Sequence, residues 1–163
     1  MLPKFDINHM RQSADFRRGH AEDQDWLFQL FRTTMQDFID QAWGWEELLQ
    51  REGFATSLPA REFQIIEAAG TAVASYHLTR NSDHLLLDMI MVEPSRQRQG
   101  YGRLMMAAIK AEAHKAQLPV RLSVLQTNPA IGFHEHEGFI EYSRDQHSLQ
   151  MIWVPDFDPS PGN

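Results

Sequence analysis

The sequence contains no cysteine among its 163 residues, which excludes disulfides, thiolate metal ligands and a cysteine nucleophile. It also lacks an apolar run near the ~20 residues that span a bilayer. Its N-terminal stretch lacks the continuous apolar segment of a signal peptide. From these absences we expect a cytoplasmic protein without a membrane partner.

Clustered metal-ligand side chains are missing too. His20, His77 and His84 stand apart from one another in the sequence. His134 and His136 are two residues apart, so they do not share a helical face. The sequence therefore predicts no metal site.

Clustered positive charge is absent as well. The formal net charge is −7, and Lys and Arg are scattered along the chain without a basic run. Nucleic acid is therefore not an expected partner, because binding to phosphates needs clustered cations. An acidic surface is most simply a solvated one. The alternative is a cleft that attracts cationic amines.

Hydrophobic residues make up 42% of the chain, which is enough for the core of one domain of this length. We expect a single domain over residues 1–155. The segment 156–163 is rich in Pro, Asp, Ser and Gly and has no hydrophobic period, so it is predicted to be a flexible C-terminal tail. A monomer and a homodimer both remain open.

Hydrophobic spacing predicts a mixed α/β chain. Apolar residues recur at helical spacing from Ala21 to Phe38, and a second short helix is expected from Trp45 to Arg51, bounded by Gly44 and Gly53. The later elements follow from β-rich runs and from glycine and proline signals. They are two strands within 63–78 joined at Ala69-Gly70, a strand buried on both faces over 84–92, a helix over 104–116, a strand over 120–125, a helix opened by Asn128-Pro129 and ended by Gly138, and strands over 139–142 and 147–154.

The junction over 92–103 is the most informative segment. Here a buried strand is expected to run into a loop, and Gly100 and Gly102 stand where the next helix begins. The N–H groups of a helix N-terminus bind anions, and glycine lets a diphosphate approach the backbone. The alternative is that the two glycines only permit a tight turn. A Walker A loop would need Lys and Ser or Thr after the glycine, and a dinucleotide fold would need a third glycine, so neither is indicated.

Two segments in this order resemble the GNAT superfamily of N-acetyltransferases. The first, Gln97-Arg98-Gln99-Gly100-Tyr101-Gly102, resembles the family's Q/R-x-x-G-x-G/A signature and follows Val92-Glu93-Pro94. The second, NPAIGFHEHEGF over 128–139, resembles the block N-P-A-x-x-F-Y-E-x-x-G-F. The resemblance extends over about 16–153, although the family's opening strand is not recognisable in the sequence.

The resemblance implies an α/β fold with a central, mostly antiparallel mixed sheet, splayed in the middle and covered by helices on both faces. It also implies acetyl-CoA as cosubstrate. Pantetheine would pair with the backbone of Ile90, Met91 and Val92, and Asn128 would face it unless it is a plain helix cap. The implied cofactor-binding residues are Ile90, Met91, Val92, Gln97, Arg98, Gln99, Gly100, Tyr101, Gly102, Arg103, Asn128 and Phe133.

The implied reaction is direct attack of a primary amine, on a small molecule or a peptide, on the acetyl thioester. A backbone N–H near Met91 or Val92 would stabilise the oxyanion. An alkylamine has a pKa of about 10.4, so it arrives protonated and needs a base. We expect Asp88 to be this base, since it interrupts the apolar run LLLDMIMV. The alternative is a structural Asp bonded to a neighbouring loop.

A second acidic element lies in the segment Trp43-Gly44-Trp45-Glu46-Glu47. Trp43, Trp45 and Glu46 would bind a cationic acceptor by aromatic faces and carboxylate. Glu47 is a reserve candidate for the base. The alternative is that the tryptophans pack in the core.

His134 stands where the family usually has a tyrosine acid. In that role it would protonate the leaving thiolate, and with a usual pKa near 6.5 it would lose effectiveness as pH rises through neutrality. The alternative is a polar residue on the surface of the last helix. The same departure leaves open a non-catalytic acyl-CoA-binding or regulatory module, and an interaction domain without cofactor is a third possibility.

Overall fold

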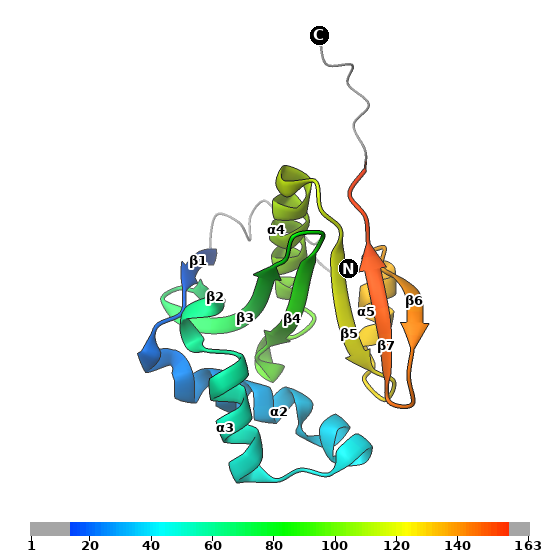
Figure 1. Cartoon of the computed structure of the whole chain (residues 1–163). Helices are drawn as coiled ribbons and strands as arrows, with labels where there is room; N and C mark the ends of the chain where they lie inside the picture. Colours follow the sequence, from blue (N-terminus) through cyan, green and yellow to red (C-terminus); the bar gives the residue numbers. More distant parts are fainter. Residues whose placement is uncertain (1–13, 157–163) are drawn as a thin grey trace, which may run out of the picture.

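A computed structural model describes residues 14–156 of the chain. Seven strands form one sheet in the order β1-β2-β3-β4-β5-β7-β6, and helices cover both of its faces (Figure 1). Neighbouring strands run antiparallel except β4 and β5, which run parallel. The predicted α/β fold with a mixed, mostly antiparallel sheet is therefore confirmed. The predicted tail lies outside the described residues, apart from Asp156.

The elements have these bounds: β1 Ala14–Arg18, η1 Ala21–Asp23, α2 Gln24–Trp43, α3 Glu47–Ser57, η2 Ala60–Glu62, β2 Phe63–Ala68, β3 Thr71–Arg80, β4 Leu85–Val92, η3 Pro94–Arg96, α4 Tyr101–Ala116, β5 Val120–Leu125, α5 Ala130–His136, β6 Ile140–Arg144 and β7 Ser148–Trp153.

Several helix boundaries differ from the sequence-based prediction, and the opening strand was not recognised in the sequence. Gly53 does not end its helix, because it lies on an exposed face and the next residue, Phe54, is buried and anchors another turn. The preceding helix continues past Phe38 to Trp43. The opening strand β1 is an edge strand in which only Ala14 is buried, so its sequence carries no hydrophobic alternation.

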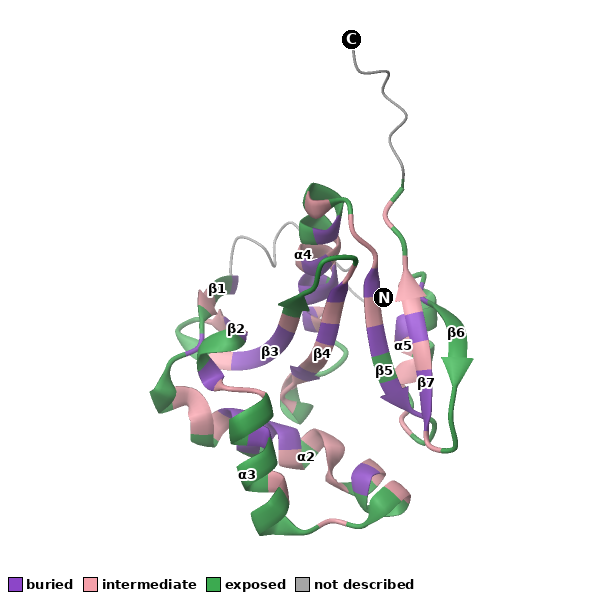
Figure 2. Ribbon diagram, viewed as in Figure 1, coloured by how far each residue is buried: buried purple, intermediate pink, exposed green. Residues whose placement is uncertain are grey.

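Two hydrophobic clusters fill the two sides of the sheet. One packs α4 against the central strands through residues such as Met105, Ile109 and Leu122. The other packs α2 and α3 against Phe63 and Ile65 of β2. Buried positions accordingly line the inner faces of the helices and the middle of the sheet (Figure 2). The sheet is thus packed on both faces.

An irregularity in β4 opens the sheet at its centre. His77 of β3 pairs with Met89 and Leu78 pairs with Leu87, so Asp88 is an extra residue that bulges from β4. The pairing of β4 with β5 covers only three residues, Leu85 to Leu87. Beyond them the two strands diverge, as the predicted splayed sheet requires. Residues 88–90 are consequently half-buried, and β4 is not buried on both faces as predicted.

Candidate active site

A cleft of about 250 Å³ lies between the diverging strands β4 and β5. Helix α2 forms its base, and the segment after β5 closes one side. The lining residues are Phe31, Met35, Ile39, Trp43, Leu87, Asp88, Met89, Ile90, Leu122, Ser123, Val124, Leu125, Asn128, Ala130, His134 and Ser148. Most of this wall is apolar, so the few polar side chains in it stand out as candidates for chemistry.

Asp88 is the carboxylate of this cleft, and two side chains of β3 contact it. Its Oδ2 lies 2.7 Å from Nδ1 of His77 and accepts a hydrogen bond from Oγ1 of Thr79 at 2.6 Å. Within residues 14–156 both bonds reach the same oxygen, so Oδ1 is the one left for a ligand. The structure thus places Asp88 against a strand, not against a loop as the alternative proposed, and on the cleft wall.

His77 is the residue that the sequence interpretation missed. It is not isolated: Nδ1 faces Asp88, and Nε2 lies 3.0 Å from Oε2 of Glu62. Burial lowers the pKa of His77, but hydrogen bonds and charges from Asp88 and then Glu62 outweigh this effect and raise it. A regular antiparallel hairpin closed over 81–84 would pair residue 77 with residue 88, and this register was the signal available in the sequence. The bulge moves the pairing of His77 to Met89 but keeps Asp88 beside it.

His134 lies inside the cleft wall and not on the surface, so the surface alternative is wrong. Its ring contacts the rings of Phe133 and Phe139, with centroids 5.4 and 5.9 Å away. Burial lowers its pKa to about 4, against a weaker opposing effect of Glu137. The expected titration near 6.5 is therefore corrected: this imidazole is neutral at physiological pH.

The loop before α4 has the geometry of an anion site. Gly100 has a left-handed φ of 95°, and Arg98 has a φ of 62°. The side chains of Gln97 and Gln99 donate to the backbone oxygens of Val92 and Ser95, which shapes the loop from within. The first N–H groups of a helix have no intrahelical partner, and here they belong to residues 101–103.

Other predicted cofactor residues have local packing roles as well. The side chain of Tyr101 is buried in the core, which leaves only its backbone for a ligand. A Cβ on Gly102 would lie 3.2 Å from the ring of Phe133, so this glycine also permits helix packing. Asn128 accepts a hydrogen bond from the amide of Ala130 at 2.9 Å, as the cap alternative proposed, and it lines the cleft as well.

Only Trp43 of the second acidic element reaches the cleft. It lies at the mouth, where its ring is 5.3 Å from that of His147 in the turn between β6 and β7. Trp45 packs against Phe28 and Phe31, as the core alternative proposed.

The two carboxylates of this element are not in the cleft wall. Glu46 is exposed, and Glu47 hydrogen-bonds Arg32 and Trp45. The structure therefore does not bring Glu46, Glu47 or Trp45 together with Asp88.

A model of the acetyltransferase (GNAT) domain family matches residues 59–141, just over half of the chain. The chain belongs to the GNAT acetyltransferase family. The match includes β4, the loop before α4 and the helix that carries His134. A comparison with curated proteins finds no match.

Solved structures share the GNAT fold at low sequence identity. The PaiA N-acetyltransferase of Thermoplasma acidophilum in complex with coenzyme A is 18% identical, with a TM-score of 0.70 over 87% of this chain and 99% of that one. The ribosomal-protein-S18-alanine N-acetyltransferase of Escherichia coli is 20% identical, with a TM-score of 0.70 over 92% and 99%. Naa20 of Chaetomium thermophilum, with a bisubstrate analogue, is 22% identical, with a TM-score of 0.63 over 86% of both chains.

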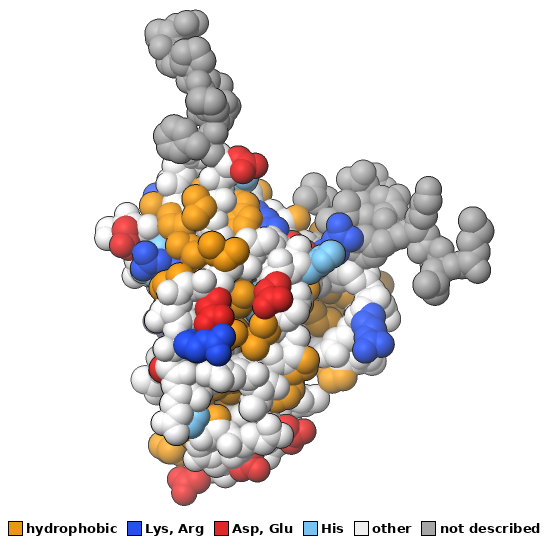
Figure 3. Space-filling model, turned by 90° about the vertical axis from the view of Figure 1, so that its right-hand side faces the viewer, with side chains coloured by type: hydrophobic (Ala, Val, Ile, Leu, Met, Phe, Trp, Pro, Cys, Tyr) orange, Lys and Arg blue, Asp and Glu red, His pale blue; other side chains and the backbone are white. Residues whose placement is uncertain are grey.

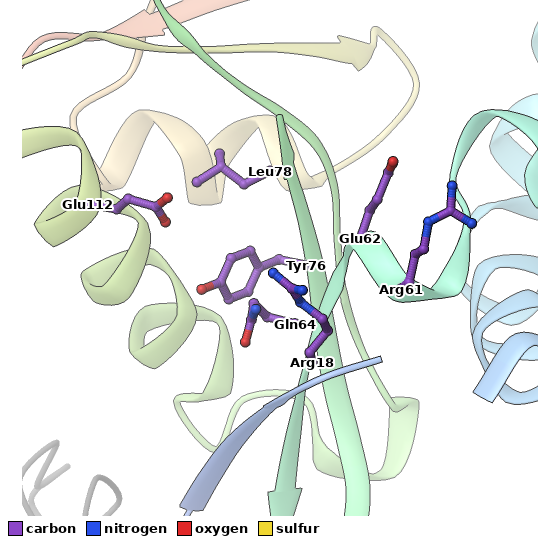
Figure 4. A pocket seen from close by; sticks show the side chains of 7 residues that line it. All are labelled: Arg18, Arg61, Glu62, Gln64, Tyr76, Leu78 and Glu112. Atoms are coloured by element: carbon purple, nitrogen blue, oxygen red, sulfur yellow. The ribbon is translucent and has the colours of Figure 1, made fainter. Parts of the chain in front are cut away.

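The GNAT domain has a second cavity of about 380 Å³ beside α4 (Figure 4). It is lined by Arg18, Arg61, Glu62, Gln64, Tyr76, Leu78 and Glu112. Tyr76 projects between the strands and α4, and its burial, with a smaller effect of Glu112, raises its pKa to about 12. Its phenol is therefore neutral, and this cavity carries charges of both signs.

On the face of the GNAT domain in Figure 3 the described Lys and Arg side chains are scattered, some of them beside Asp or Glu, and further Asp and Glu side chains lie along the lower edge. Over residues 14–156 no group of three His, Asp or Glu side chains is placed to hold a metal ion. Within the same range no helix is long and apolar enough to cross a membrane.

Proposed function

We propose that the protein transfers an acetyl group from acetyl-CoA to a primary amine of a small molecule or a peptide, by direct attack in a ternary complex. The observation that carries this proposal is the splayed pair β4 and β5, with one carboxylate on its wall and a helix N-terminus at its end. In the reaction an N–C bond forms and the C–S bond breaks. The acceptor nitrogen loses two protons, one to the base before attack and one that ends on the coenzyme thiolate.

The cofactor would lie along the unpaired edge of β4. Among the residues that the structure describes, the backbone of β4 past Leu87 has no strand partner on the β5 side, which supports pairing of pantetheine with Ile90, Met91 and Val92. The pyrophosphate would bind the amides over 98–103, with Gln97 shaping the loop. Asn128 and Phe133 would complete the wall.

The base would be Asp88, through Oδ1, which accepts a proton from the acceptor ammonium directly or through a water molecule, so that the neutral amine can attack. The oxyanion would be stabilised by a backbone N–H of Met91 or Val92 that faces the slot. Both groups belong to one short stretch of β4, so the bulge sets their separation.

The acid would be His134, which contributes as a neutral imidazole because its pKa is about 4. A neutral ring carries one N–H, and this group can hydrogen-bond the leaving sulfur. A thiol has a pKa of about 8.5, so its thiolate needs little assistance. His134 is accordingly expected to add little to the rate of acetyl transfer, and this effect should not change with pH above 5.

The acceptor would enter past Trp43 and His147, whose rings flank the cleft mouth. One of the similar structures is named as an N-acetyltransferase of an alanine of ribosomal protein S18, and another holds a bisubstrate analogue. Both support an amine acceptor of peptide or small-molecule type.

We also propose that residues 1–155 act as one domain, since 14–153 contribute to a single sheet and its helices. A cytoplasmic monomer or homodimer fits this proposal.

The proposal is tested by combining a thermal-shift titration with a thiol-release assay on an amine panel. A ligand selective for the native state adds about 2.7 kcal/mol at a hundredfold excess over its Kd. We expect acetyl-CoA to stabilise the fold and amines to release thiol. Stabilisation without thiol release would favour the non-catalytic acyl-CoA-binding module. If acetyl-CoA neither stabilises the fold nor releases thiol, both the enzyme and the acyl-CoA-binding module are overturned.

Asp88→Asn tests the base. It keeps the shape of the side chain and removes its charge, so we expect turnover to fall at least tenfold with cofactor affinity nearly unchanged. The matched control is Asp83→Asn in the exposed turn before β4, which should retain wild-type rates. Equal rates in both variants would show that Asp88 is not the base.

A further inference from the structure

A row of three side chains connects the cleft to the surface through the sheet. His77 in β3 is 2% exposed, and its two ring nitrogens lie 2.7 Å from Asp88 and 3.0 Å from Glu62. Asp88 lines the cleft, whereas Glu62 has a half-exposed side chain and lines the second cavity. The imidazole is thus the link between a cleft carboxylate and a solvated one.

The arrangement determines the charge of the ring. A neutral imidazole has one N–H, so one of the two carboxylates would face a nitrogen lone pair. Only the imidazolium donates to both oxygens. The raised pKa of His77 agrees with this assignment.

The other neighbours of the ring do not carry charge. The ring of Phe63 in β2 meets it edge-on at 5.0 Å between centroids, and Thr79 donates to the same oxygen of Asp88. Within the described part of the chain, the carboxylates of Asp88 and Glu62 are the charged groups that contact His77.

We propose that Glu62 and His77 are positioning residues for Asp88: Glu62 holds His77 as an imidazolium, and the imidazolium fixes Oδ2 of Asp88 so that Oδ1 faces the cleft. This inference rests on the proposed role of Asp88 as the base. The imidazolium also pairs the charge of this carboxylate when cofactor and acceptor displace water from the cleft, where an unpaired charge is costly.

The proposal predicts a pH dependence with a defined sign. His77 has a raised pKa, so its charge is present at low pH and is lost as pH rises through that pKa. Above it, Asp88 loses its anchor and the rate falls. The alkaline limb of the rate profile therefore belongs to His77, while the neutral His134 does not contribute to it.

Glu62→Gln is the decisive variant, because the half-exposed side chain can be replaced without disturbing the core. The His77 ring is titrated by long-range ¹H–¹⁵N NMR, and kcat/KM is measured over the same pH range. Loss of one solvated opposite charge should lower the pKa of His77 by about 1 unit and move the alkaline limb down by the same amount. The Kd for acetyl-CoA should stay within about twofold, as expected when only a positioning contact changes.

Two further variants complete the test. The control Glu52→Gln, on the exposed face of α3, should leave both curves unchanged. His77→Gln, which keeps an amide donor but removes the titrating charge, should remove the alkaline limb. An unchanged His77 pKa in Glu62→Gln would overturn the charge bridge, and a shifted pKa with an unmoved limb would overturn its role in positioning.

The NMR result also separates this inference from the proposed function. A shifted His77 pKa with no turnover on any amine would overturn the proposed reaction and the positioning role, but would leave the charge bridge established. Wild-type rates in Asp88→Asn together with a moving limb in Glu62→Gln would assign the base elsewhere and overturn positioning through Asp88.

Discussion

The burial of His134 makes the stability of the fold depend on pH. The folded protein binds a proton at this ring with a pKa of about 4, compared with the ordinary histidine pKa of 6.5 that applies to the unfolded chain. Because the folded pKa is lowered, the stabilisation is present above pH 6.5 and is lost as pH falls toward 4. The difference of about 2.5 between the two values corresponds to about 3.4 kcal/mol in total. About 2 kcal/mol of it is lost between pH 7.5 and pH 5.

The assay is urea unfolding of wild type and His134→Phe at pH 7.5 and pH 5. We expect wild type to lose about 2 kcal/mol more than the variant on acidification. The contribution of His77 to the pH dependence of stability has the opposite sign in this range. Since His77 is present in both proteins, this contribution cancels in the comparison. His136→Gln, on the exposed face of the same helix, should behave as wild type. Equal losses in wild type and His134→Phe would show that His134 is not buried in its neutral form.

Three further outcomes follow from residues with local roles. Gly138→Ala should destabilise the fold by about 1–2 kcal/mol, because its φ is 96° and a Cβ would lie 3.2 Å from Trp153; thermal melts that agree with wild type would contradict this geometry. Ile109→Ala should lose about 2–5 kcal/mol in urea unfolding, since the side chain is fully buried between α4 and the sheet, and a loss below about 1 kcal/mol would argue against that packing. Glu47→Gln should keep wild-type turnover, because its carboxylate bonds Arg32 outside the cleft; a large loss in kcat would return Glu47 to the reaction.

Elements defined by local backbone chemistry could be predicted from the sequence. Ala69 and Gly70 both have positive φ, 52° and 80°, as a two-residue hairpin turn requires. Gly100 takes the left-handed conformation before α4, and Gly138 ends the last helix in the same way. In each case one or two adjacent residues determine the turn, so no distant contact was needed.

Features that depend on pairing between distant segments were not predictable from single residues. Glu47 was considered as a base because its partner Arg32 lies 15 residues away on another helix. His77 was classed as isolated because Glu62 reaches it only when β2 pairs with β3, and Asp88 reaches it only when β3 pairs with β4. The pKa of His134 depends on the walls that bury it, and the sequence does not specify them. Electrostatics of this kind require the tertiary structure.

The open centre of the sheet has a consequence for self-association. An exposed strand edge is normally a template for pairing with another molecule, and proteins protect such edges by charge or by covering them. Here the unpaired edge of β4 faces β5 across a slot of about 250 Å³, with α2 beneath it. A strand of a second molecule could pair with this edge only by entering between β4 and β5. The backbone groups that would bind a ligand are therefore accessible to small molecules, while β5 hinders their pairing with a strand of another molecule.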